Sequence, residues 1–240
     1  MPEALLSLSG VNTHIGQYHI LHGVDLAVPQ GGLTMLLGRN GAGKTTALRT
    51  IMGLWRASAG SIRLGNEEIH RRATPDIARL GIAYVPENMG IFAGLTVREN
   101  FLLAAREAEI DERRLAWIFE LFPAMKKFWN GLAGNLSGGQ KQMLAISRAV
   151  VEPRKLMLVD EPTKGLSPAI IGAMIEAFKE MKRDATLLVV EQNFHFARSL
   201  GDNVAVMDSG RIVHAGRMAE LAADNSLQQR LLGLSLDSHQ

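Results

Sequence analysis

Residues 33–45 read LTMLLGRNGAGKT, and this stretch decides the fold of the 240-residue chain. Its first part, Leu33–Leu37, is a compact apolar run suited to a strand that is buried on both faces. A glycine-rich loop follows, and a helix is predicted from about Lys44 to Met52. Glycines let backbone N–H groups approach and wrap phosphate oxygens where a Cβ would obstruct them. The order strand, glycine loop and helix therefore predicts a phosphate-binding loop, because a helix N-terminus also attracts anions.

The loop itself fits the pattern G-x-x-x-x-G-K-[ST]. Lys44 is expected to reach the β- and γ-phosphates of a nucleotide, and the Thr45 hydroxyl is expected to bind Mg²⁺. The alternative is a glycine-rich turn that matches by chance, which the flanking strand and helix disfavour. The predicted phosphate-binding residues are Gly38, Arg39, Asn40, Gly41, Ala42, Gly43, Lys44, Thr45 and Thr46.

A second apolar strand, Leu156–Val159, ends in two carboxylates. Ligands of open α/β sheets bind beyond the carboxyl ends of the strands. Adjacent carboxylates point in different directions where a strand ends. We therefore expect Asp160 to serve Mg²⁺ and Glu161 to face an attacking water.

The segment Leu136–Gln140, LSGGQ, opens another predicted helix with Ser137 as its N-cap. A serine cap followed by two glycines makes a second anion-ready helix start. One nucleotide does not need two such cradles, so this one is expected to bind a nucleotide held by another copy or a homologous chain. A helix start that is merely capped is an equally weighty alternative.

Taken together, these three segments resemble the ABC-transporter ATPase family over nearly the whole chain. The resemblance implies two ATPase domains that pair head to tail, with each ATP sandwiched between the phosphate loop of one and the LSGGQ segment of the other. It also implies that Glu161 is the general base. The residues expected to contact the partner's nucleotide are Ser137, Gly138, Gly139 and Gln140.

Several positions depart from the broad family pattern. Glu87 stands where most members have a glutamine, and its carboxylate is expected to join the Mg²⁺ ligands. Gln192 stands where the family has a histidine; it can hydrogen-bond a γ-phosphate but cannot carry a proton. Ser167 replaces an aspartate. Ile15 replaces the aromatic residue that stacks on adenine, and the nearby Tyr18 is either its substitute or a structural strand residue.

These departures resemble one branch of importer ATPases, which energises uptake of branched-chain amino acids, with related members for amides and urea. The resemblance implies a second ATPase subunit, two membrane permease subunits and an external substrate-binding protein. It places the chain at the cytoplasmic face of the inner or plasma membrane, held there by the permease. Met89, Ile91 and Phe92 are candidate permease contacts, or they pack inside the protein.

The predicted fold class is α/β: a P-loop NTPase core with a mostly parallel sheet, an N-terminal antiparallel β subdomain and an inserted helical subdomain. We expect a single ABC ATPase domain over 1–240, with its core at 1–87 and 152–240 and the helical subdomain at about 88–151. Residues 96–151 are predicted to be helical, with Thr96 and Ser137 as N-caps and a break at Phe122-Pro123.

Composition narrows the alternatives. The 26 Lys and Arg residues nearly balance 24 Asp and Glu residues and are scattered rather than striped, so no nucleic-acid partner is predicted. No stretch approaches the ~18 apolar residues of a membrane span, and the chain has no cysteine. Three other functions stay open: the ATPase of another transport system, a soluble ABC ATPase outside transport, and a regulatory module that binds ATP without turnover.

Overall fold

A six-stranded sheet forms the centre of the computed structural model, which describes residues 4–106 and 109–233. Its strand order is β10-β9-β3-β8-β7-β6. Five strands run parallel, and β10 pairs antiparallel with β9. In chain order the strands are β3 (Leu33–Leu37), β6 (Ile82–Val85), β7 (Leu156–Asp160), β8 (Thr186–Glu191), β9 (Asn203–Asp208) and β10 (Arg211–Arg217).

The central strands β3, β7 and β8 are buried along their whole length because both faces of the sheet are covered. Alternate side chains enter two different cores, as the two-residue period of a strand requires. From β7, Met157 and Val159 join the core that contains α6, α7 and α8, whereas Leu156 and Leu158 join the core beneath the N-terminal strands. This double burial explains why these strands are continuous apolar runs in the sequence.

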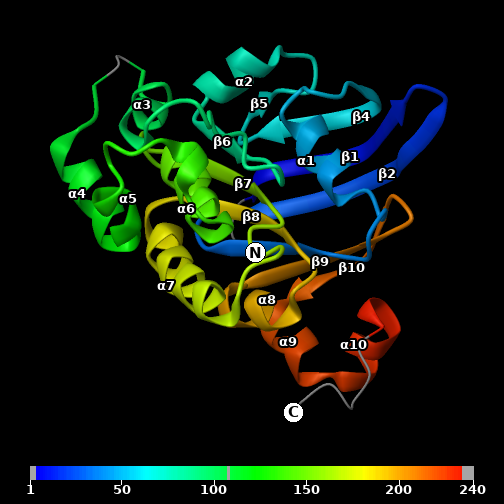
Figure 1. The fold of residues 1–240 in the computed structure, drawn as a ribbon. Helices are drawn as coiled ribbons and strands as arrows, with labels where there is room; N and C mark the ends of the chain where they lie inside the picture. The colour runs from blue at the N-terminus through cyan, green and yellow to red at the C-terminus, as the bar shows by residue number, and fades with distance from the viewer. Residues whose placement is uncertain (1–3, 107–108, 234–240) are drawn as a thin grey trace.

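A second sheet of four antiparallel strands, in the order β2-β1-β4-β5, covers one face of the central sheet. Helix α1 (Lys44–Ile51) contributes to the core that the two sheets share. Figure 1 shows β1, β2 and β4 together with α1 on one side of the molecule. The predicted fold class, including its antiparallel N-terminal part, is confirmed. The bounds are β1 (Ala4–Ile15), β2 (Tyr18–Pro29), β4 (Ala57–Leu64), β5 (Glu67–Glu68) and α2 (Thr74–Arg79).

Four α-helices, α3 to α6, gather at the opposite side of the molecule in Figure 1. Thr96 and Ser137 are N-caps of α3 and α6, as predicted, and the break at Phe122-Pro123 separates α4 from α5. Helix does not fill 96–151, however: non-helical segments follow α3 and α5, and a short 3₁₀ turn precedes α6. The bounds are α3 (Val97–Leu102), α4 (Glu112–Leu121), α5 (Pro123–Lys127), η1 (Ala133–Asn135) and α6 (Gly138–Ala149).

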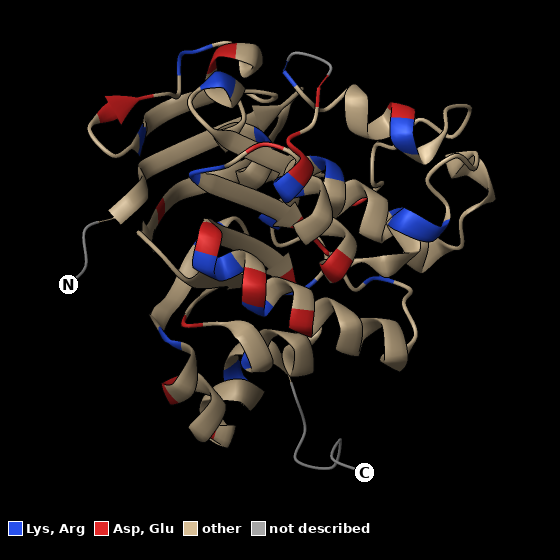
Figure 2. Ribbon diagram, turned by 90° about the vertical axis from the view of Figure 1, so that its left-hand side faces the viewer, with Lys and Arg blue, Asp and Glu red and all other residues tan. Residues whose placement is uncertain are grey.

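The remaining helices follow the central strands. Helices α7 (Pro168–Asp184) and α8 (Phe194–Leu200) cover the sheet face opposite β1 and β2, and Phe178 packs edge-on against Phe196 between them. Helices α9 (Met218–Ala223) and α10 (Asn225–Leu232) follow β10. Lys and Arg lie interspersed with Asp and Glu over the elements in Figure 2. Within residues 4–106 and 109–233, none of the helices has the length and apolar character needed to cross a bilayer.

Candidate functional site

The candidate site lies at the carboxyl edge of the parallel sheet, where four strands end side by side. The glycine loop follows β3, Glu87 follows β6, Asp160 ends β7 with Glu161 directly after it, and Gln192 follows β8. Parallel strands bring such residues together even though they are up to about 150 positions apart in the chain, since all the carboxyl ends meet at one edge. The topology thus explains why the predicted catalytic residues converge.

The glycine loop adopts a backbone that its sequence requires. Gly38 lies so close to β9 that a Cβ there would stand 2.2 Å from the Met207 carbonyl oxygen. Gly43, the N-cap of α1, has a φ of 106°, a conformation that L side chains rarely adopt. Because glycine has no side chain with which to cap the helix, the first turn of α1 is available to an external anion.

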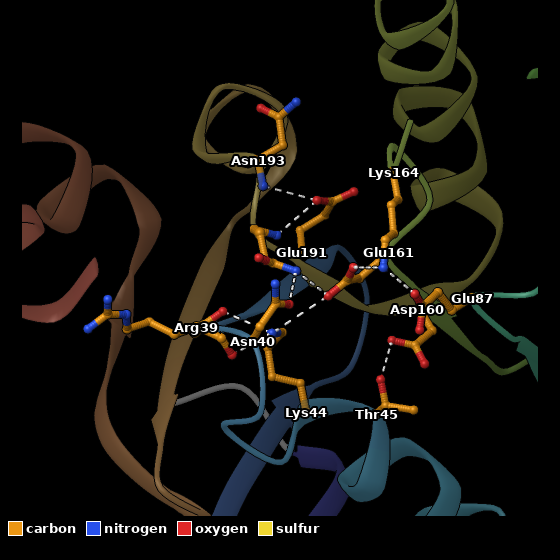
Figure 3. Close-up of polar contacts among 12 residues, drawn as sticks. Arg39, Asn40, Lys44, Thr45, Glu87, Asp160, Glu161, Lys164, Glu191 and Asn193 are labelled. Atoms are coloured by element: carbon orange, nitrogen blue, oxygen red, sulfur yellow. Dashed lines mark hydrogen bonds and ion pairs between the residues drawn. The ribbon is translucent and has the colours of Figure 1, made fainter. Parts of the chain in front are cut away.

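Lys44 is the first residue of α1, and its side chain is only 4% exposed. Its Nζ donates hydrogen bonds to the carbonyl oxygens of Gly38 and Arg39, at 2.9 and 3.0 Å. The nearest carboxylate is that of Glu161, whose Oε1 lies 3.7 Å from Nζ (Figure 3). Burial lowers the pKa of Lys44, and nearby carboxylates oppose this effect. The loop therefore folds around an ammonium group that an incoming phosphate can contact.

Asp160 and Thr45 form the part of the site suited to a metal ion. The Thr45 hydroxyl donates to Asp160 Oδ1 at 3.0 Å, and the Tyr84 hydroxyl donates to the other carboxylate oxygen at 3.4 Å. Asp160 is fully buried, and burial raises its pKa to about 6. Burial likewise raises the pKa of Tyr84 to about 12. Because desolvation disfavours the charged form of this carboxylate, a cation bound beside it would stabilise the charge.

Glu161 points away from Asp160 because the chain turns sharply between them. Glu161 has a φ of 47°, and its backbone N–H donates to Val190 of β8 at 2.9 Å. Its carboxylate accepts a hydrogen bond from the Gln192 side-chain amide at 2.5 Å. Lys44 and Lys164 lie 3.7 and 3.8 Å from its two oxygens. A strained residue held by several donors fits a group whose position matters for function.

Gln192 links Glu161 to the glycine loop. Its side-chain nitrogen also donates to Asn40 Oδ1 at 2.7 Å. Glu191, which is only 2% exposed and was not predicted as a site residue, holds the backbone of Gln192. The Glu191 carboxylate accepts hydrogen bonds from the backbone N–H groups of Thr163, Gln192 and Asn193, and from the Thr163 hydroxyl. One buried carboxylate thus joins the loops that follow β7 and β8.

A cavity of about 330 Å³ lies against the glycine loop. Two of its lining residues, Ile20 of β2 and Lys164, were not predicted as site residues. Ile20 could have been suspected only from its position in the strand beside the loop. The lining residues are Ile20, Asn40, Gly41, Gly43, Lys44, Thr45, Thr46, Glu87, Glu161 and Lys164.

The predicted adenine-stacking residues lie on the β1–β2 hairpin. Ile15 and Tyr18 pair at the tip of the β1–β2 hairpin, and Tyr18 is 65% exposed. They are absent from the lining of the cavity as the described residues define it, and Ile20 is the hairpin residue that borders it. The stacking of Ile15 or Tyr18 on adenine stays a prediction.

The LSGGQ segment also lies apart from the glycine loop, at the start of α6. The Ser137 hydroxyl accepts from the Gln140 backbone N–H, and the Gln140 side chain accepts in return from the Ser137 N–H. Ser137 and Gly138 are exposed, whereas a Cβ on Gly139 would stand 3.1 Å from Ile170 of α7. This arrangement leaves the segment on the surface, where another chain can reach it.

The oxygen groups near Thr45 suit Mg²⁺. This ion usually binds one or two carboxylates, and water and phosphate oxygens complete its shell. Asp160 and Thr45 supply a carboxylate and a hydroxyl, and Glu87 lines the 330 Å³ cavity together with Thr45. Among the residues that the structure describes, no group of three His, Cys, Asp or Glu side chains forms a complete metal cage. The residues present therefore fit a metal that arrives together with phosphate.

Comparison with known proteins identifies the family. Residues 21–164, more than half of the chain, match the model described as ABC transporter. The chain belongs to the ABC transporter family. The resemblance drawn from the motifs is therefore confirmed, and the chain is an ATP-binding ATPase of this family.

Individual proteins agree with this assignment. The chain is 38% identical over 232 residues to the high-affinity branched-chain amino acid transport ATP-binding protein BraG of Pseudomonas aeruginosa, covering 95% of this chain and all of BraG. It is 32% identical to the arginine transport ATP-binding protein ArgV of Corynebacterium glutamicum, covering 96% of each. A solved ATP-binding subunit of an ABC transporter superposes with a TM-score of 0.80 at 28% identity, covering 97% of this chain and 96% of that one. The chain is thus an ATP-binding subunit of an ABC transporter.

Proposed function

We propose that this chain hydrolyses ATP to energise import of branched-chain amino acids, as one of two paired ATPase subunits bound to a membrane permease. The observation that carries the proposal is the position of Glu161 beside the glycine loop, with Gln192, Lys44 and Lys164 around its carboxylate. Similarity to BraG and the joint presence of Glu87, Gln192 and Ser167 support the substrate class.

The catalytic roles follow from this geometry. The N–H groups of the glycine loop and the Lys44 ammonium bind the β- and γ-phosphates. Glu161 accepts the proton of the attacking water, and Gln192 orients Glu161 and donates to the γ-phosphate. When bound, Mg²⁺ neutralises charge on the phosphate oxygens, and Thr45, Asp160 and Glu87 are the residues that would hold it. The reaction is ATP + H₂O to ADP and phosphate.

The LSGGQ segment contributes to a second chain's site. Ser137 and Gly138 are exposed at an N-terminus that carries the partial positive charge of α6. These residues, with Gly139 and Gln140, contact the γ-phosphate bound by a partner subunit, which is either a copy or a homologous chain. Closure of the pair then assembles the donors around the transferred phosphoryl group.

A groove of about 640 Å³ between the core and the helical side is the proposed permease site. Apolar residues and three arginines, Arg49, Arg148 and Arg154, line it. Such a groove fits a short permease helix that ends in carbonyl or carboxylate groups. Of the three predicted contacts, Met89 and Ile91 pack against the core, whereas Phe92 is 48% exposed with the Arg148 guanidinium over its ring.

The substitution Glu161→Gln tests the catalytic proposal. ATP binding should persist, and turnover should fall by about 10²–10⁴-fold because a positioned base is removed. Hydrolysis and nucleotide binding are measured on the same preparation. Turnover at the parental rate would remove Glu161 from the role of base, and a parental chain that binds ATP without any turnover would favour the regulatory module.

Transport is tested in cells. Deletion of the gene should abolish high-affinity uptake of leucine, isoleucine and valine. Loss of arginine uptake alone would favour a different amino-acid system, in line with the similarity to ArgV. Phe92→Asp should lower uptake while ATP hydrolysis persists, whereas Val213→Asp, at a residue of similar exposure on β10, should change neither.

A further inference from the structure

Lys164 lies in the loop between β7 and α7, and its side chain reaches into the nucleotide cavity. Its Nζ donates to Glu87 Oε1 at 2.5 Å and lies 3.8 Å from Glu161 Oε2 (Figure 3). Contact with Glu87 is the largest of the effects that raise the pKa of Lys164, so the ammonium stays charged at neutral pH. A single cation thus connects the loop after β6 with the general base after β7.

The Glu87 carboxylate that pairs with Lys164 is also a predicted ligand of Mg²⁺. Glu87, Thr45 and Lys164 line one cavity, and Glu87 is close enough to Asp160 to act on its ionisation. A carboxylate oxygen bound to an ammonium is less available to a metal ion, because both cations draw on the same negative charge. Lys164 therefore stands where it competes with Mg²⁺ for Glu87.

We propose that the Lys164 ammonium pairs with the Glu87 carboxylate until the metal–nucleotide complex binds. By competing with the metal in this way, Lys164 sets the Mg²⁺ concentration needed for nucleotide binding. The proposal rests on the proposed function, because it takes Glu87 as a metal-binding residue. Lys164 is a positioning residue: it acts through Glu87 and through the charge of the cavity.

Loss of the Lys164 charge should affect binding of the metal ion and binding of metal-free nucleotide in opposite directions. Without the Lys164 ammonium, the net charge of the cavity is one unit more negative, so the cavity holds a divalent cation more strongly. The same change repels nucleotide that carries no metal. A lysine that only braced the loop would act differently, since its loss would weaken binding under both conditions. Lys164 is 60% exposed, so solvent screens the pair and effects of about two- to fivefold are expected.

The experiment measures equilibrium binding of a non-hydrolysable ATP analogue to the purified full chain, first across a Mg²⁺ titration and then in EDTA. Lys164→Met should lower the Mg²⁺ concentration for half-maximal binding about two- to fivefold and weaken binding in EDTA by a similar factor. Lys164→Arg keeps the charge and should stay near the parent. Glu87→Ala should move the Mg²⁺ requirement in the opposite direction.

Lys179→Met is the matched control, because Lys179 forms an exposed ion pair with Glu176 on α7 at 2.8 Å. It should change neither measurement. Parental behaviour of Lys164→Met, or weaker binding both with Mg²⁺ and in EDTA, would overturn the proposal. Either result leaves the ATPase proposal intact provided that Glu161→Gln still binds ATP and loses turnover, so the two failures are distinguishable.

Discussion

Helices α1 and α6 both begin at glycine-rich segments, yet their N-termini are completed differently. The N-cap of α1 is Gly43, in a left-handed conformation and without a side chain that could accept from the first turn. The N-cap of α6 is Ser137, which exchanges hydrogen bonds with Gln140 in a capping box. The first helix start depends on an external anion to complete it, whereas the second is already satisfied by its own residues.

The two helix starts also differ in their surroundings, since one lies in a cavity and the other on the surface. The α1 start lies in a cavity that Lys44 and the strained residue Glu161 also line, and Thr45 in its first turn donates to the buried Asp160 carboxylate. The α6 start lies on the surface. Similar glycine-rich sequences thus give one helix start that is open to a ligand in a cavity and another that is capped on the surface. Strain and desolvation at α1 are consistent with function, since active sites often store such unfavourable energy.

Alanine substitutions at the two glycines should give the largest difference. Gly43→Ala places a Cβ 3.1 Å from Leu21 on a backbone with φ 106°, so ATP affinity should fall at least about tenfold through about 1–3 kcal/mol of strain. Gly138→Ala meets open space in a helical first turn, and should stabilise the chain by about 0.4–1 kcal/mol without changing ATP affinity. Calorimetric titration and thermal unfolding measure both. Equal losses of affinity would contradict the contrast.

The buried charge of Asp160 should lower the unfolding free energy of the chain at neutral pH, an effect that the α6 start does not have. Its folded pKa of about 6 lies above the unfolded value of 3.8, so the folded chain binds the proton more tightly. Stability contributed by this group is therefore present below about pH 4 and lost as the pH rises through about 6. Asp160→Asn should raise the unfolding free energy of the nucleotide-free chain by about 1–3 kcal/mol at pH 7.

The advantage of Asp160→Asn should vanish below about pH 4, where the aspartate of the parent is protonated in both states. Denaturant unfolding across pH 4–7 measures it. Asp76→Asn is the control, because Asp76 is an exposed residue paired with Arg79. A pH-independent difference between Asp160→Asn and the parent would show that burial of charge is not its cause.

The two capping boxes offer a smaller but matched test. Thr96 caps α3 with Glu99 in the same manner as Ser137 caps α6 with Gln140. Ser137→Ala and Thr96→Ala should each lower stability by about 1 kcal/mol. Only Ser137→Ala should also lower ATP turnover in the assembled transporter. Equal turnover in the two variants would mean that the α6 start is a cap alone, the alternative that the sequence left open.

The sequence predicted the parts of this site that local patterns determine. The glycine loop, the paired carboxylates and the Ser137 cap each lie within a short segment whose neighbours fix its conformation. Ile20 and Lys164 escaped prediction because tertiary packing alone brings them to the cavity. Glu191 escaped because a glutamate at the end of a strand signals nothing until its four donors are known.

The helical side shows the same limit. Helix-favouring sequence over 96–151 indicated the class of structure, but the non-helical segment after α5 depends on contacts with the start of α3. The N–H groups of Val97 and Arg98, for example, donate to the carbonyls of Gly131 and Trp129. Such pairings between distant segments are not encoded in helical periodicity.

We expect α1 to bind nucleotide within this chain and α6 to contact a nucleotide that a partner chain holds. Equilibrium binding of ATP to the isolated chain tests it most directly, with Lys44→Met and Ser137→Ala compared against the parent. Lys44→Met should weaken binding by about tenfold or more, because a charge-assisted hydrogen bond to phosphate is lost. Ser137→Ala should stay within about twofold of the parent, since a partner's nucleotide is absent. Parental affinity in Lys44→Met, or an equal loss in Ser137→Ala, would contradict the account.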